Sequence, residues 1–158
     1  MKIGVIADTH SLDIPDKVLK AFKNVDVICH AGDFCSVDEL NIFKDIKDVH
    51  AVYGNCDDSD LVKALPEKII IAIDGLRVGM FHGEGSAKTV LESVKRKFIK
   101  DKVDVVIFGH SHQAFNKVID GTLFFNPGSP NDTITAPFCS YGQLEITNGN
   151  VFGKIIKL

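Results

Sequence analysis

The feature that most constrains this chain is a pattern repeated through its first sixty residues, in which a short apolar run ends in a polar residue. The runs and the residues that follow them are 2–7 with Asp8, 25–29 with Gly32-Asp33, and 49–52 with Gly54-Asn55. Each run is short and rich in aliphatic residues, which is typical of a buried strand. Open α/β sheets bind ligands beyond the C-terminal ends of their strands. The pattern therefore predicts an α/β fold with its functional site at the strand ends.

Two helices are expected between these strands. Pro15 suits a first helical turn, and a stripe of apolar residues follows it. Ser36 and Glu39 have the spacing of a capping box, which begins the second helix. The buried faces are predicted to comprise Val18, Leu19 and Phe22 in the first helix, and Leu40, Phe43 and Ile46 in the second. The first third of the chain is therefore βαβαβ.

The rest of the chain indicates hairpins. Asp-Gly or Asn-Gly pairs lie between apolar runs at 74–75, 120–121 and 148–149, which is a hairpin signal. A helix is expected from about Ser86 to Lys100, and a buried strand from Val103 to Phe108. This part is therefore predicted to contain mostly antiparallel strands and one helix. No linker or repeat interrupts it, so residues 1–158 are expected to form one domain.

Composition excludes several classes of function. A net charge of -3 makes nucleic acid an unlikely partner, since no basic surface is expected. The four cysteines form no C-x-x-C pair, and no apolar run is long enough to span a membrane. A charged residue comes too early in the chain for a secretory leader. We therefore expect a cytoplasmic protein without a membrane partner.

Histidines add to the polar strand ends. After the run 103–108 come Gly109, His110, Ser111 and His112, and residues two apart in extended chain point the same way. The pair alone could be an ordinary polar loop. The full set of candidate site residues is Asp8, His10, Asp33, Asn55, His82, His110 and His112. Seven such ligands suit two divalent cations about 3.5–4 Å apart that share a carboxylate, and mixed nitrogen and oxygen donors favour transition metals over Ca²⁺ or Mg²⁺.

These residues resemble the motifs of the calcineurin-like metallophosphoesterase superfamily. The motifs are D-x-H, G-D, G-N, H-G and G-H-x-H, and all five are present in order between residues 8 and 112. The short chain, the cysteine after the motif asparagine, and Asn126-Pro127-Gly128-Ser129 resemble the YfcE-type phosphodiesterases of bacteria and archaea. The resemblance implies an α/β four-layer αββα sandwich with two mixed β-sheets. It also implies hydrolysis of a small-molecule phosphodiester by a metal-bridging hydroxide.

The resemblance also implies the role of each residue. Asp8, His10 and His112 would hold one metal, and Asn55, His82 and His110 the other, with Asp33 as the bridge. The expected cofactor is a pair of divalent ions, Mn²⁺ first, with Ni²⁺, Fe, Zn²⁺ or Co²⁺ as alternatives. Asn55 and Cys56 are the candidate catalytic and substrate-binding residues.

Two departures from the superfamily pattern concern substrate choice. Cys56 stands where many members have a histidine that protonates the leaving oxygen, and a thiol is a poorer donor. Acidic leaving groups are therefore expected to be favoured, unless Cys56 only packs under the site. Glu84 stands where relatives often have a second histidine, and it could touch the substrate.

Two other functions compete with hydrolysis. The retromer phosphoesterase-fold subunit is similar to this family and acts chiefly as a scaffold, so an interaction protein on the same fold is the alternative. A mononucleotide-binding α/β domain would need a glycine fingerprint after the first strand, which the sequence lacks. A homodimer is a further expectation from the family.

Overall fold

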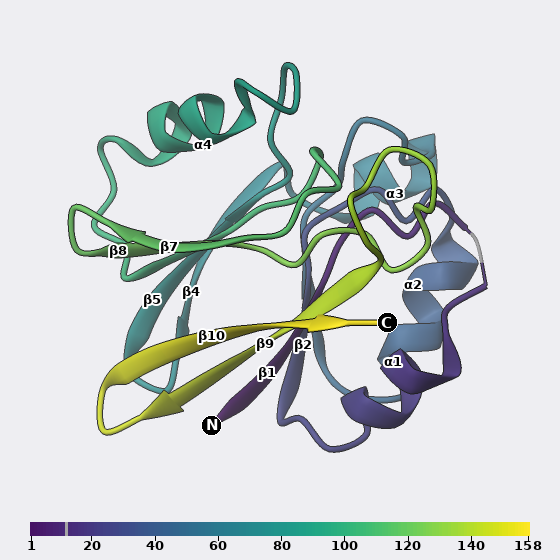
Figure 1. The fold of residues 1–158 in the computed structure, drawn as a ribbon, viewed down its shortest axis with the longest axis horizontal. Coiled ribbons are helices and arrows are strands. Elements are labelled where there is room, and N and C mark those ends of the chain that lie inside the picture. The colour runs from purple at the N-terminus through teal and green to yellow at the C-terminus, as the bar shows by residue number, and fades with distance from the viewer. Residues whose placement is uncertain (12) are drawn as a thin grey trace.

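Two five-stranded sheets form the centre of the computed structural model, which describes residues 1–11 and 13–158 (Figure 1). The first sheet has the strand order β10-β9-β1-β2-β3. Its strands are β1 (Lys2–Ile6), β2 (Val27–His30), β3 (Val49–Ala51), β9 (Ser140–Thr147) and β10 (Asn150–Lys157). The first three strands run parallel, and β9 pairs antiparallel with both β1 and β10.

The second sheet has the order β4-β5-β6-β8-β7. Its strands are β4 (Lys68–Ile73), β5 (Leu76–Phe81), β6 (Val105–Ile107), β7 (Phe115–Ile119) and β8 (Thr122–Asn126). The β4–β5 and β7–β8 pairs are antiparallel, whereas β5, β6 and β8 run parallel. Across residues 68–158 antiparallel pairs outnumber parallel ones, as expected, because the β9–β10 and β1–β9 pairs are antiparallel too. The parallel pairs have no turn signal, since α4 (Val90–Phe98) lies between β5 and β6 in the chain and β7 lies between β6 and β8.

Side chains point alternately to the two faces of each sheet, so each sheet packs against the other sheet on one face and against helices on the opposite face. In β1, Ile3 and Val5 face the core between the two sheets, and Ile6 faces the helices α1 (Asp16–Phe22) and α2 (Val37–Lys44). In β6, Val105 and Ile107 join the same central core. Between them Val106 faces α4, whose apolar stripe is Val90, Val94 and Phe98. The predicted four-layer sandwich with two mixed sheets is confirmed, and Figure 1 shows helices on the outer sides of both sheets.

The three hairpin predictions are confirmed by the backbone. Positive φ angles occur at both central residues of each turn: Asp74 (49°) and Gly75 (83°), Asp120 (50°) and Gly121 (83°), Asn148 (52°) and Gly149 (75°). Two consecutive positive φ angles are the geometry of a type I′ turn, whose twist matches that of the strands it joins.

The helices differ from expectation in two places. Helix α3 (Ser59–Ala64) was not predicted, although Asp58 caps it by accepting the N–H groups of Asp60 and Leu61. Helix α4 begins at Val90, because residues 86–89 form turns. Within the described part of the chain, every helix is too short or too polar to cross a bilayer.

The capping box of α2 is only half formed. The Ser36 hydroxyl accepts the Glu39 N–H, as predicted, at 3.4 Å. The Glu39 side chain does not return to Ser36; its Oε2 accepts the Ser11 N–H at 2.7 Å. Glu39 therefore connects α2 to the segment that follows β1.

Candidate metal centre

The polar strand ends of the two sheets meet at one place. Asp8, Asp33 and Asn55 follow the parallel strands β1, β2 and β3, so they emerge at the same edge of the first sheet. His82 and His110 follow the parallel strands β5 and β6 of the second sheet. The His110 N–H donates to Asp8 Oδ1 at 3.1 Å, which joins the two edges.

Tight turns direct these side chains inward. Five of the seven predicted site residues have a left-handed backbone: Asp8 (φ 57°), His10 (55°), Asp33 (60°), His110 (68°) and His112 (55°). Residues other than glycine rarely adopt this backbone conformation, because it costs roughly 1–3 kcal/mol per residue. Such residues are concentrated at functional sites. The fold therefore holds the seven side chains together at the expense of backbone strain.

Asp8, His10 and His112 form a first group. The Nε2 atoms of His10 and His112 lie 3.1 Å apart, and His112 Nε2 lies 3.7 Å from Asp8 Oδ1. His112 Nδ1 is 2.6 Å from Asp132 Oδ2, so Nδ1 carries the proton and Nε2 presents a lone pair to the group. Asp8 Oδ2 is buried and has no hydrogen-bond partner among the described residues.

Asn55, His82 and His110 form a second group. His82 Nδ1 donates to the Ala31 carbonyl at 2.7 Å, and His110 Nε2 donates to the Gly85 carbonyl at 2.6 Å. The other ring nitrogens, His82 Nε2 and His110 Nδ1, are therefore the ones that could bind a metal ion. Both nitrogens face Asn55 Oδ1, His82 Nε2 at 3.2 Å and His110 Nδ1 at 2.8 Å.

Asp33 lies between the two groups. Its Oδ2 is 3.8 Å from His10 Nε2 and 3.3 Å from His82 Nε2. Its Oδ1 accepts the Cys56 N–H at 2.8 Å. Asp33 is therefore placed where one carboxylate can serve both groups, as the predicted bridge requires.

The donor set fits divalent cations. Each of the two ring nitrogens that face the Asn55 amide oxygen needs a proton or a cation between itself and that oxygen, and a buried carboxylate oxygen without a partner is costly. The ligand atoms of Asp8, His10 and His112 lie within 4.8 Å of one another, as do those of Asp8, Asp33 and His82. Nitrogen and oxygen donors in this proportion suit transition metals.

Comparison with known proteins agrees with this geometry. The model of the calcineurin-like phosphoesterase superfamily domain matches residues 1–149. The chain belongs to this superfamily. The assignment classes it with the metal-dependent phosphoesterases, and the sequence motifs that suggested the family are those that form the site.

Three relatives illustrate the range of this superfamily. A protein named "probable metallophosphoesterase" from Methanothermobacter thermautotrophicus is 37% identical over 134 residues, which cover 82% of this chain and 77% of that protein. A structure described as a novel archaeal phosphodiesterase is 28% identical, with a TM-score of 0.78 over 99% of this chain and 100% of that one. Vps29 from Entamoeba histolytica, solved in complex with zinc, is 25% identical, with a TM-score of 0.75 over 99% of each chain.

The charges of this phosphoesterase site interact strongly. Burial raises the pKa of Asp8, and the nearby His82 and His112 offset part of that rise. Burial would also raise the pKa of Asp33, but the hydrogen bond and charge of His82 and the Cys56 amide hold it below its usual range. Burial would lower the pKa of His82, but Asp33 and Asp8 raise it to about 8. His82 therefore carries a proton on Nε2 in the metal-free protein at neutral pH, and a bound cation would take the place of that proton.

Cys56 lies at the surface of the site. The thiol is exposed, and Asn55 Nδ2 donates to its sulfur at 3.2 Å, so the alternative that Cys56 packs beneath the site is wrong. Partial burial and the charges of Asp33 and Asp57 raise its pKa to about 11. Cys56 is therefore a neutral thiol beside Asn55. Glu84 is exposed near Asn55, where both residues line a hollow of about 180 Å³.

His30 has a structural role. It is fully buried and stacks on Phe34 with ring centroids 3.4 Å apart. Its Nδ1 accepts the Gly32 N–H at 3.2 Å, so its Nε2 donates to the Thr9 hydroxyl at 3.1 Å. Burial lowers its pKa well below the ordinary value, so the ring is neutral.

Asp57 holds the backbone of the loops that carry the site residues. Its Oδ2 accepts the N–H groups of Asp33 (3.1 Å) and Gly54 (2.7 Å), and its Oδ1 accepts that of Cys35 (2.7 Å). Asp132 and Glu39, which contact the site loops, were not identified as site residues. Asp57 lies two residues after Asn55 and could be found from the motif. Asp132 carries no such signal, because it lies outside the five metal-site motifs, three residues after Ser129.

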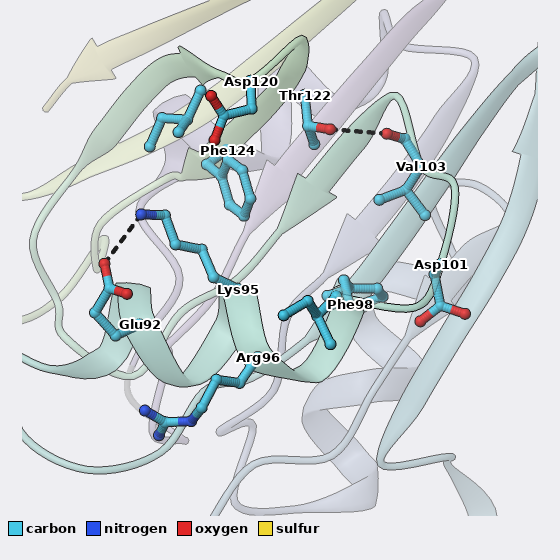
Figure 2. Close-up of a pocket in the computed structure, with 11 residues that line it drawn as sticks. Glu92, Lys95, Arg96, Phe98, Asp101, Val103, Asp120, Thr122 and Phe124 are labelled. Carbon is cyan, nitrogen blue, oxygen red and sulfur yellow. Dashed lines mark hydrogen bonds and ion pairs between the residues drawn. The ribbon is translucent and has the colours of Figure 1, made fainter.

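Two cavities of similar volume compete as the functional site. One, of about 440 Å³, lies between α4 and the β7–β8 hairpin, with Phe98 and Phe124 beside a Glu92–Lys95 pair (Figure 2). The other, of about 460 Å³, is lined by Asp8, His10, His112 and the segment 129–135. Only the second of these two adjoins the histidine and carboxylate groups, so the chemistry belongs there.

Proposed function

We propose that this protein is a two-metal phosphodiesterase that hydrolyses a small phosphodiester with an acidic leaving group. Two observations carry the proposal: the His82 and His110 ring nitrogens converge on Asn55 Oδ1, and the buried Asp8 Oδ2 has no partner among the described residues. A bound cation would stabilise both. The resemblance to a structure described as an archaeal phosphodiesterase supports the choice of ester. The zinc of the related Vps29 structure supports a divalent ion.

The hollows around the site support a diester. A cavity of about 460 Å³ adjoins the first group, and one of about 180 Å³ adjoins Asn55 and His82 of the second. A phosphodiester has two organic groups, and one hollow on each side gives room for both. A monoester would leave one hollow unused.

Each residue has a defined task in this proposal. Two divalent cations, Mn²⁺ first, would supply a hydroxide nucleophile at neutral pH and neutralise charge on the phosphoryl oxygens. One cation would be held by Asp8, His10 and His112. The other would be held by Asn55, His82 and His110, and Asp33 would contact both cations. Asn55 and Cys56 face the open side, where they would contact the phosphoryl group. A neutral thiol is a weak acid, so the leaving oxygen must be stable without much protonation.

Reconstitution of the metal-free protein tests this proposal. Protein treated with a chelator is assayed with Mn²⁺, Ni²⁺, Zn²⁺ and Co²⁺ on bis-p-nitrophenyl phosphate, p-nitrophenyl phosphate and a cyclic nucleotide. We expect metal-dependent hydrolysis of the aryl diester, and its loss in Asp33→Asn with the fold retained by circular dichroism. Activity on the monoester alone would refute the diesterase assignment. Metal binding without hydrolysis would favour the scaffold alternative.

The predicted cytoplasmic location and homodimer stay predictions. Gel filtration with light scattering measures the oligomeric state directly.

A further inference from the structure

The segment between β8 and β9 contributes a carboxylate to the site that no sequence motif identifies. Asp132 Oδ2 lies 2.6 Å from His112 Nδ1, and the side chain of Asp132 is only 12% exposed. Building on the proposed function, we infer that Asp132 is a positioning residue that fixes His112 in the tautomer able to bind a metal ion.

Asp132 gives the Nδ1 atom of His112 a carboxylate partner, which the other predicted ligand histidines lack on the ring nitrogen that faces away from the site. His82 and His110 donate to neutral backbone carbonyls, of Ala31 and Gly85. His10 Nδ1 lies 3.6 Å from the Cys35 sulfur. A carboxylate holds the Nδ1 proton more strongly than a carbonyl or a thiol, and it makes Nε2 a better electron donor. Among the four predicted ligand histidines, His112 is therefore the one whose tautomer is most firmly fixed.

The protein holds Asp132 itself rigidly. Its Oδ1 accepts the N–H groups of Ile134 and Thr135, both at 2.8 Å, and the Thr135 hydroxyl contacts its Oδ2. The Asp132 N–H donates to Ser129 Oγ at 3.1 Å, and that hydroxyl donates to the Asp8 carbonyl at 2.8 Å. The orientation of Asp132 is thus fixed relative to Asp8, which belongs to the same group as His112.

This arrangement makes Asp132→Asn a sharp test. In the variant, the amide oxygen would still accept the two loop N–H groups, so the amide nitrogen would face His112. Two donors cannot share a hydrogen bond, so His112 would move its proton to Nε2 and accept through Nδ1. His112 would then present an N–H instead of a lone pair to the metal, while the segment 129–135 would keep its backbone contacts.

The tautomer of His112 is read from long-range ¹⁵N–¹H NMR of the metal-free protein, and Mn²⁺ affinity is measured by calorimetry. We expect Asp132→Asn to move the proton from Nδ1 to Nε2 and to raise the dissociation constant for Mn²⁺ roughly 10- to 100-fold. An unchanged tautomer, or a dissociation constant within about twofold of wild type, would overturn the inference. The tautomer measurement needs neither metal nor substrate, so it is independent of whether the protein hydrolyses diesters.

Two controls separate positioning from loop structure. Thr135→Val removes the hydroxyl contact but keeps the carboxylate on His112, so the tautomer and the affinity should stay as in wild type. Asp58→Asn alters a carboxylate that likewise caps two backbone N–H groups, those of Asp60 and Leu61, with no histidine partner among the described residues. It should also leave both readouts unchanged. If Thr135→Val shifts the tautomer as Asp132→Asn does, the effect belongs to the loop and the inference fails.

Discussion

Glu39 should make the stability of this protein depend on pH. Its side chain lies on α2 with only 4% of the residue exposed, and Oε2 accepts the Ser11 N–H at 2.7 Å. Oε1 has no partner among the described residues. Burial raises the pKa of Glu39 from 4.5 to about 7, although the neighbouring Thr9 hydroxyl and the Ser11 N–H act in the opposite direction.

The sign of the effect follows from the direction of this shift. A carboxyl with a raised pKa stabilises the fold fully below the unfolded pKa, and this contribution is lost as pH rises through the folded pKa. A rise in the pKa from 4.5 to about 7 limits the contribution of Glu39 to the free energy of unfolding to about 3 kcal/mol. Solvent screening reduces the expected contribution to about 1.5–3 kcal/mol.

Glu39→Gln isolates this contribution because glutamine cannot ionise but can still accept the Ser11 N–H. The free energy of unfolding of Glu39→Gln minus that of the wild type is the quantity to follow. This difference should rise by about 1.5–3 kcal/mol between pH 4.5 and pH 8, because only the wild type loses stability. Urea unfolding in EDTA measures it without interference from metal binding. Glu145→Gln makes the same substitution at an exposed position and serves as the control. A difference for Glu39→Gln that is constant across this range would refute the reasoning.

Three further predictions concern the metal centre. Saturating Mn²⁺ at about 100 times its dissociation constant should stabilise the protein by about 2.7 kcal/mol, read as a higher melting temperature that EDTA reverses. Cys56→His should speed hydrolysis of diesters with poor leaving groups by up to about 10²-fold, since it supplies a stronger general acid; equal rates for poor leaving groups would contradict that role. Gly54→Ala should weaken Mn²⁺ binding at least tenfold by calorimetry, because its Cβ would collide with the Asp33 carboxylate. Gly75→Ala is the control for an added methyl group far from the site: nothing lies within 4 Å of its Cβ, and the strain at φ 83° should cost stability but leave Mn²⁺ affinity unchanged.

Local sequence accounts for much of the fold. The hairpin turns at 74–75, 120–121 and 148–149 follow from side chains that tolerate positive φ, so they could be predicted from neighbouring residues. Helix α3 was missed because its six residues carry only one buried apolar side chain, Leu61, too few for a periodic signal. The parallel pairing of β5, β6 and β8 was missed because it depends on contacts between distant segments.

By itself the sequence determined which residues end the strands, and hence the family and the seven candidate ligands. Those residues follow their strands directly, so their position is a local property. Only the tertiary structure decided which ring nitrogen of three candidate ligands faces the site, because that depends on distant partners: Ala31 for His82, Gly85 for His110 and Asp132 for His112. It also decided that Glu39 turns toward Ser11 and not back to Ser36. Hydrogen bonds between segments far apart in the chain leave no periodic trace in the sequence, so they become visible only when the two sheets are packed.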